Sequence, residues 1–347
     1  MANASNVLER LELKLPLVQA PMGGFTTPAL VAAASNAGAL GSIGAPYMAP
    51  EAIEAATTAV REQTNRPFGL NLFVFDVPPV REDEVARIAE RLAPYCRELG
   101  IDPPALGGPA HPDVGRQLEA MLAVRPAVFS FCMGVPSPAV LAECRRLDIL
   151  TVGTATTLAE GLTLEAAGVD AVCAQGAEAG GHRGGFLGDP AENMVGILPL
   201  TSMLAARLEI PVIAAGGIMN GAAASAMLRA GAAAVQLGTA FLACPESGAA
   251  EAHKDVLFSK AAERTTLTRA FSGREARGIV NRYMLELEGA ELSQFPILNA
   301  MTRGLRGAAA KAGRTEFMSL WAGQGAPLIR RMPAAALIEA LGAEMAA

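Results

Sequence analysis

The segment AEAGGHRGG, residues 177–185, places one histidine and one arginine among four glycines. Histidine is scarce in this chain, which has only His111, His182 and His253. An imidazole changes its charge near neutral pH, so His182 is a candidate general base. The competing interpretation is a solvated polar side chain in a loop, and the surroundings of His182 in the fold decide between the two.

Amide side chains stand at the ends of several predicted strands: Gln19, Asn71, Gln175 and Gln236. Buried amides need hydrogen-bond partners. A flat heterocycle with donors and acceptors along its edge, such as an isoalloxazine ring, would supply them. Hydrogen bonds to neighbouring loops are the alternative for each amide taken alone.

Glycines follow the last two predicted strands of the pattern described below. Gly216 and Gly217 come after the seventh strand, and Gly238 and Thr239 come after the eighth. Glycine lets backbone N–H groups approach an anion closely, and a threonine hydroxyl adds a donor. Many (β/α)8 barrels bind phosphate at this place. The pattern therefore predicts a phosphate site, with tight turns that bind nothing as the alternative.

The elements that must position these residues appear as a repeated alternation of apolar runs and Ala-rich helical stretches. The runs are continuous rather than alternating, which is typical of parallel strands buried on both faces. Helix starts are indicated at Thr27-Pro28, Ser137-Pro138 and Asn220, and helix ends at Gly38, Gly100, Gly168 and Gly231. Strands are expected at residues 15–20, 39–44, 67–72, 127–132, 148–153, 169–175, 210–215 and 232–237. Eight strand–helix units predict an α/β fold of the (β/α)8, or TIM-barrel, type, with a doubly wound open sheet as the alternative.

The predicted barrel occupies residues 1–244 and is interrupted after its third strand by an insertion at 73–126. The insertion carries one charged helix near residues 81–99 and a Pro/Gly-rich stretch. Residues 245–347 have a mostly helical pattern. Because chemistry in such barrels sits at the carboxyl ends of the strands, we expect this C-terminal segment to cap that end.

Composition excludes several classes of partner. Lys and Arg number 28 and Asp and Glu 34, so the net charge is 28 − 34 = −6, without the basic stripe that nucleic acid requires. Apolar runs are too short for a membrane span, and no signal peptide is apparent. The five cysteines form no CxxC pair. We expect a cytoplasmic monomer or homodimer that acts on small molecules.

The absence of certain residue patterns argues against several classes of enzyme. None of the four lysines lies at a predicted strand end, which argues against Schiff-base and pyridoxal-phosphate enzymes. No histidine pair suggests a metal hydrolase, no carboxylate pair suggests a glycosidase, and no GxGxxG motif follows a strand. A phosphate-bearing redox cofactor held by amides and backbone groups fits what remains. We therefore expect FMN and no metal.

Several stretches together resemble the nitronate monooxygenase family, formerly called 2-nitropropane dioxygenases, whose members are FMN-dependent barrels. They are QAPMGG (19–24), PFGLNLF (67–73), AQGAEAGGHRGGF (174–186), PVIAAGGI (211–218), AAAVQLGTAFL (232–242) and SLWAGQG (319–325). The resemblance spans most of the chain. Related flavin reductases share the barrel motifs.

The resemblance implies roles for individual residues. FMN contacts are implied for Met22, Gly23, Asn71, Gln175, Gly180, Gly181, Gly216, Gly217, Gln236, Leu237, Gly238 and Thr239, and Trp321 and Gln324 would close the site. His182 would be the catalytic base, with an ordinary pKa near 6.5. Cys132 stands where the family pattern has a second histidine, and it is expected either to contact substrate or to fill space. Arg183 would either recruit an anionic substrate tail or point outward into solvent.

The implied reaction is oxidative denitrification of an alkyl nitronate of the propionate 3-nitronate type. Oxygen would convert the nitronate to a carbonyl compound and nitrite, through one-electron reduction of the flavin. Two alternatives stay open at this point. One is an FMN-dependent NAD(P)H reductase of quinones or enoyl thioesters on the same fold, and the other is a non-catalytic flavin-binding barrel.

Overall fold

The computed structural model describes residues 10–290 and 292–347, and its centre is a barrel of parallel strands. The strands are β1 (Leu17–Gln19), β2 (Gly41–Gly44), β3 (Phe68–Phe73), β4 (Val128–Cys132), β5 (Leu150–Ala155), β6 (Ala171–Gln175), β8 (Val212–Ala215) and β9 (Ala234–Leu237). They follow the order β1-β9-β8-β6-β5-β4-β3-β2, and a parallel bridge between Val18 and Leu40 joins the two ends. The predicted (β/α)8 barrel is confirmed, and each predicted run overlaps its strand.

Helices surround the barrel as the sequence signals predict. They are α2 (Pro28–Asn36), α3 (Pro50–Arg61), α5 (Val114–Val124), α6 (Pro138–Arg146), α7 (Leu158–Ala166), α8 (Ile197–Arg207) and α9 (Gly221–Arg229). The side chains of Thr27, Ser137 and Asn220 cap the amino ends of α2, α6 and α9 by accepting backbone N–H bonds. The four glycines expected at helix ends have positive φ, a conformation that residues with a side chain adopt reluctantly.

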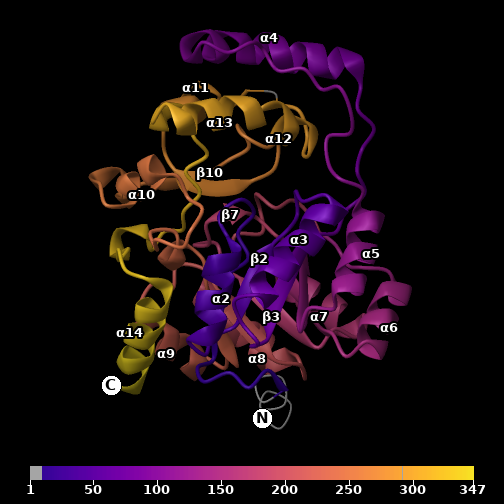
Figure 1. Cartoon of the computed structure of the whole chain (residues 1–347), viewed down its shortest axis with the longest axis vertical. Helices are drawn as coiled ribbons and strands as arrows, with labels where there is room; N and C mark the ends of the chain where they lie inside the picture. Colours follow the sequence, from indigo (N-terminus) through magenta and orange to yellow (C-terminus); the bar gives the residue numbers. More distant parts are fainter. Residues whose placement is uncertain (1–9, 291) are drawn as a thin grey trace.

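The last barrel helix comes from the end of the chain. Helix α14 (Ala334–Ala346) packs against α9 and α2, on the side of the barrel in Figure 1. Its Leu337, Ile338 and Leu341 are buried in the same hydrophobic cluster as apolar residues of those two helices. Likewise α5 lies within the segment expected as an insertion, yet it packs on β3 and α3. Elements from outside the expected barrel segments therefore also pack on the barrel, so the packing of the helices does not mark a boundary at residue 244. The sequence of a short amphipathic helix does not indicate which element its apolar face contacts.

A cap lies over one end of the barrel (Figure 1). It comprises α4 (Glu82–Leu99), α10 (Glu251–Leu257), α11 (Arg282–Glu286), α12 (Ile297–Met301), α13 (Arg303–Lys311) and the 3-10 helices η2 (Lys260–Glu263), η3 (Thr315–Phe317) and η4 (Ala326–Leu328). Helix α4 packs on α12 and α13, so the insertion and the C-terminal segment build the cap jointly. Tyr95, Phe271, Tyr283 and Phe317 lie in its core. No helix in the described part of the chain is long and apolar enough to cross a membrane.

A second, small sheet ties the cap to the glycine-rich loop. Its antiparallel strands are β7 (Gly181–His182), β11 (Ala276–Ile279) and β10 (Thr265–Thr268), with β11 in the middle. His182 pairs with Ala276, so the loop histidine of the sequence stands on a strand. The sequence does not predict this sheet, because strands of two and four residues are too short to show a periodic pattern.

Candidate active site

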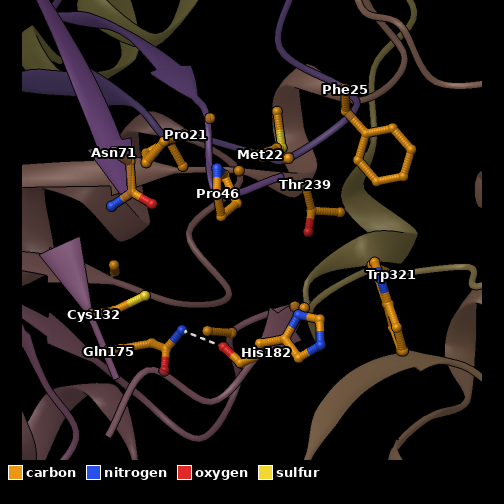
Figure 2. Close-up of a pocket in the computed structure, with 18 of the residues that line it drawn as sticks. Pro21, Met22, Phe25, Pro46, Asn71, Cys132, Gln175, His182, Thr239 and Trp321 are labelled. Atoms are coloured by element: carbon orange, nitrogen blue, oxygen red, sulfur yellow. Dashed lines mark hydrogen bonds between the residues drawn. The ribbon is translucent and has the colours of Figure 1, made fainter. Parts of the chain in front are cut away.

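A cavity of about 620 Å³ lies between the carboxyl ends of the barrel strands and the cap. This volume is in the range of pockets that hold cofactors and small substrates. Figure 2 shows Asn71, Met22 and Thr239 on one side, with Cys132, Gln175 and His182 facing them and Trp321 beside His182. Residues distant in the sequence therefore meet at the end of the barrel where (β/α)8 enzymes place their chemistry.

Most of the site residues expected from the sequence line this cavity. They are Met22, Gly23, Asn71, Cys132, Gln175, Gly180, Gly181, His182, Gly216, Gly217, Gln236, Gly238, Thr239 and Trp321. Three others do not line it. Leu237 is buried in the barrel wall, Gln324 is an exposed residue whose backbone N–H donates to Glu178 O, and Arg183 is buried behind the loop.

His182 is held among aromatic rings at the cavity wall. The centroid of its imidazole lies 6.0 Å from that of Phe73, 5.6 Å from that of Phe295 and 5.7 Å from that of Trp321. The pairing of β7 with β11 fixes its backbone. Strand pairing and ring packing restrict both the position and the rotation of the imidazole, as a group that acts on substrate requires.

The hydrogen bonds of His182 indicate which ring nitrogen carries the proton. Nε2 lies 2.9 Å from the Ser272 hydroxyl, whose oxygen also lies 3.0 Å from the backbone oxygen of Arg274. When the hydroxyl donates to that backbone oxygen, it accepts from the imidazole, and Nε2 carries the hydrogen. Nδ1 is left with a free lone pair, which makes it the basic atom of the site.

The acidity of His182 differs from the sequence expectation. Burial, together with the positive charges of Arg274 and Arg306, lowers its pKa to about 3. The expectation of an ordinary pKa near 6.5 is wrong, because the sequence did not show that two arginines would flank a buried ring. At neutral pH the imidazole is uncharged, so it does not form an ion pair with an anionic substrate. It is also a weak base.

The buried histidines give a stability prediction. His253 is also buried, and its pKa is lowered to about 4, chiefly by burial. In the unfolded chain both rings take up protons below about pH 6.5, whereas in the folded chain they stay neutral until much lower pH. The free energy of unfolding should therefore fall as pH drops from 6.5 towards 4, by about 1.4 kcal/mol per pH unit for each histidine.

Urea denaturation at pH 7.5 and pH 5.5, with parent and His253→Gln compared, measures this effect. The variant lacks one of the buried titrating rings, so the difference between its two unfolding free energies should be smaller than the parent's. Equal pH dependence in the two proteins would show that His253 does not titrate as burial requires.

The strand-end amides are mainly occupied by the protein itself. Gln175 Nε2 donates to His182 O at 3.0 Å, and its Oε1 accepts from Gly184 N at 2.8 Å (Figure 2 shows the first bond). Gln19 does not line the cavity and accepts from Ser42 N. Asn71 Nδ2 donates to Ser130 Oγ at 3.0 Å. Gln19 therefore bonds within the protein, and Gln175, which also lines the cavity, braces the loop that carries His182.

Arg183 is fully buried, contrary to the interpretation of an outward, solvated side chain. Its guanidinium donates to the backbone oxygens of Gly176, Gln175 and Asn193, at 2.6, 3.3 and 3.1 Å. It does not line the cavity, so the expected contact with an anionic substrate tail has no support in this structure either. The sequence did not predict that Arg183 binds loop carbonyls, because residue types do not show which backbone carbonyls need a hydrogen-bond donor.

The glycines around His182 are required by packing within the protein. A Cβ on Gly180 would lie 2.5 Å from the backbone of Ala322, and one on Gly184 would lie 2.8 Å from Thr154. Gly181 has φ +74°. The loop is therefore threaded tightly between the barrel and the cap, which explains the composition of AEAGGHRGG without any ligand.

The glycines after β8 and β9 form an open backbone cradle. Gly216 and Gly217 have φ of +132° and +68°. Within residues 10–290 and 292–347, no protein acceptor is found for the amides of Gly217 and Gly238. Thr239 Oγ1 accepts from Gly323 N at 2.9 Å, which leaves the hydroxyl proton available. These donors, together with a lining that contains no Asp or Glu among the described residues, fit the phosphate of a cofactor such as FMN.

Cationic residues of the cap also face the cavity, and the sequence analysis missed them. Arg303 and Arg306 line it from α13, together with Asn299 from α12 and Tyr47 from the loop after β2. A signal for the arginines exists in TRGLRG, because residues three apart share one face of a helix. It could not be interpreted without knowing that this face turns towards the barrel. Among the described residues no cluster of His, Cys, Asp and Glu could hold a metal ion.

Comparison with known proteins identifies the family of this chain. The model of the family described as nitronate monooxygenase matches residues 5–344. The chain belongs to this family. Family members are flavin-dependent oxidoreductases, so the chain is an enzyme of that class, and the resemblance inferred from the sequence motifs is confirmed.

Relatives match over nearly the full chain. A nitronate monooxygenase of Paraburkholderia phytofirmans is 40% identical, covering 98% of this chain and 94% of the relative. One of Pseudomonas aeruginosa is 42% identical, covering 96% and 97%. The structure of a nitroalkane oxidase from Streptomyces ansochromogenes superposes with a TM-score of 0.92 at 42% identity, covering 98% of both chains. FabK from Thermotoga maritima gives 0.77 at 27% identity, covering 98% of this chain and 96% of that one.

Proposed function

We propose that this protein is an FMN-dependent nitronate monooxygenase that acts on alkyl nitronates of the propionate 3-nitronate type. With oxygen it converts them to a carbonyl compound and nitrite. The observation that carries the proposal is the combination in one cavity of an uncharged His182, an open backbone cradle and a lining without carboxylates. The relatives named above act on nitronates and nitroalkanes by their names, which supports the same substrate class here.

The residues present would hold FMN without a charged partner for its phosphate. The amides of Gly217 and Gly238 and the Thr239 hydroxyl would donate to the phosphate, while Asn71, Met22 and Gly23 would lie along the ring. When bound, FMN supplies the one-electron chemistry and the reaction with oxygen that no side chain of this cavity provides. The protein's own contribution is to bind, orient and exclude water.

The state of His182 favours a substrate that arrives already deprotonated. A base whose pKa is about 3 removes a carbon-bound proton poorly, because general-base efficiency is greatest when the pKa lies near the working pH. A nitronate has already lost that proton. Nδ1 of His182 would serve the minor reaction with neutral nitroalkanes, and its uncharged ring would pack against a nitronate without a charge partner of its own.

Purified protein tests the proposal. We expect a yellow protein that releases FMN on heating, consumes oxygen with propionate 3-nitronate and produces nitrite without added NADH or NADPH. Anaerobic mixing with NADH or NADPH should leave the flavin oxidised. A colourless protein, or rapid bleaching by a nicotinamide cofactor without nitrite formation from the nitronate, would refute the proposal, and the second result would favour a reductase.

A further inference from the structure

We propose that Arg306 is the residue that binds the anionic head group of the substrate in this cavity. This inference deepens the proposed function and rests on it, because it assigns the positive charge that an anionic substrate requires to one side chain.

The guanidinium of Arg306 is held in a fixed orientation by a neutral residue. Its Nη2 donates to the backbone oxygen of Asn299 at 2.8 Å and to Asn299 Oδ1 at 2.9 Å. Asn299 is buried and belongs to the helix that precedes α13. A short turn between α12 and α13 thus fixes both residues, so the arginine fork is set before any ligand arrives, which lowers the entropy cost of binding.

Two donor nitrogens of this guanidinium are left over. Nε is buried without a hydrogen-bond partner in the described part of the chain. Nη1 likewise has no acceptor among the described residues. An unpaired donor that is removed from water costs free energy, and native proteins rarely leave such a donor unpaired. The missing partner is then a group outside the protein chain. The open Nη1 on a cavity wall points to a ligand as that partner.

The charge of the cavity gives the sign of the ligand. Arg303 and Arg306 line it, and no Asp or Glu does among the described residues. Arg306 is half-buried, and burial lowers the pKa of its guanidinium, which shows that the charge is partly removed from water. A partly desolvated cation without a carboxylate partner is stabilised by an anion.

The position of Arg306 indicates which anion it binds. Arg306 reaches the cavity from the cap helix α13, and His182 lines the same cavity. The glycine cradle lies on the barrel side, after β8 and β9. Both the planar nitronate group and the cofactor phosphate are anions that an arginine can bind. The place of Arg306 on a cap helix, rather than beside the barrel glycines, favours the nitronate.

Nitrate is a suitable probe, because it is a planar oxyanion of similar size that is not turned over. Its dissociation constant is measured on the protein as purified, by perturbation of the flavin spectrum and by calorimetry. In Arg306→Met we expect nitrate binding to weaken by about 10- to 100-fold, the range for losing a charged hydrogen bond. KM for the nitronate should rise by a similar factor while kcat changes less. Arg306→Lys keeps the positive charge but lacks the paired donors of the guanidinium, and it should recover part of the affinity for nitrate.

Lys311→Met is the matched control, because it removes a positive charge from the exposed last turn of the same helix. It should bind nitrate like the parent. Nitrate binding that is unchanged in Arg306→Met would overturn the proposal. So would a variant that has lost FMN but remains folded by circular dichroism, because the anion bound by Arg306 would then be the cofactor phosphate.

Failure of the proposed function can be recognised separately. Nitrate binding is measured without turnover, so it does not depend on which reaction the enzyme performs. If nitrate binding requires Arg306 but no nitrite forms from nitronates, the anion site stands and the proposed function fails. If nitrite forms from nitronates but nitrate binding does not depend on Arg306, the proposed function stands and the anion site at Arg306 is refuted.

Discussion

Replacing His182 by asparagine should lower kcat/KM for a neutral nitroalkane such as nitroethane by about 10- to 100-fold, no more than the low end of the usual contribution of a positioned general base, because its lowered pKa makes it a weak base. Asparagine removes the Nδ1 lone pair that the bond from Nε2 to Ser272 leaves free. The corresponding nitronate needs no proton removal, so its kcat/KM should fall by less than about tenfold. Oxygen uptake with both substrates, on protein whose flavin content is determined, measures the difference.

Ser272→Ala is a useful companion to this variant, because it leaves the imidazole in place and removes only the partner that fixes its tautomer. We expect kcat/KM of this variant for the neutral nitroalkane to lie between the values of the parent and of His182→Asn, with little change for the nitronate. If His182→Asn oxidised nitroethane as fast as the parent, the assignment of His182 as base would be wrong. An equal loss with nitroethane and its nitronate would indicate a binding role instead.

Substituting Gly217 by alanine should weaken FMN binding by about tenfold or more. Gly217 has φ +68°, which strains any residue with a side chain, and an added Cβ would lie 3.1 Å from Glu178 Cβ, so relief of the strain and of this contact displaces the amide of residue 217. A lost hydrogen bond to a charged phosphate accounts for this magnitude. The measurement is a flavin titration of the apoprotein, followed by fluorescence quenching.

Gly100→Ala controls for backbone strain. Gly100 has nearly the same φ, +66°, ends the outer helix α4 and has open space where a Cβ would be. Both substitutions should destabilise the fold by a similar amount, about 1–3 kcal/mol, but only Gly217→Ala should lose flavin. Equal flavin affinity in the two variants would contradict the phosphate cradle.

The barrel could be predicted from the sequence because each of its strands is a continuous apolar run with a helix signal after it. Thr27, Ser137 and Asn220 mark helix starts by a local hydrogen bond, which residue type alone reveals. The strand-end rule then brought Asn71, Gln175 and His182 to one cavity without knowledge of side-chain contacts.

What the sequence could not provide depends on contacts between distant segments. The burial of Arg183, the pairing of β7 with β11 and the return of α14 to the barrel wall are all of this kind. The pKa of His182 is another example, because Arg274 and Arg306 approach it from segments about 90 and 120 residues away in the chain. The residue type suggested a base near pH 6.5, whereas the tertiary environment makes the imidazole a neutral and weak one.

We propose that a neutral His182 and a cavity without carboxylates adapt this enzyme to nitronate anions. The most direct test compares kcat/KM for a nitronate and for its parent nitroalkane, by nitrite release in air at pH 7.5, with the nitroalkane freshly dissolved so that little of it has ionised. We expect a ratio of at least about 100 in favour of the nitronate, because a weak base provides little driving force for proton removal. Equal values for the two substrates would contradict it.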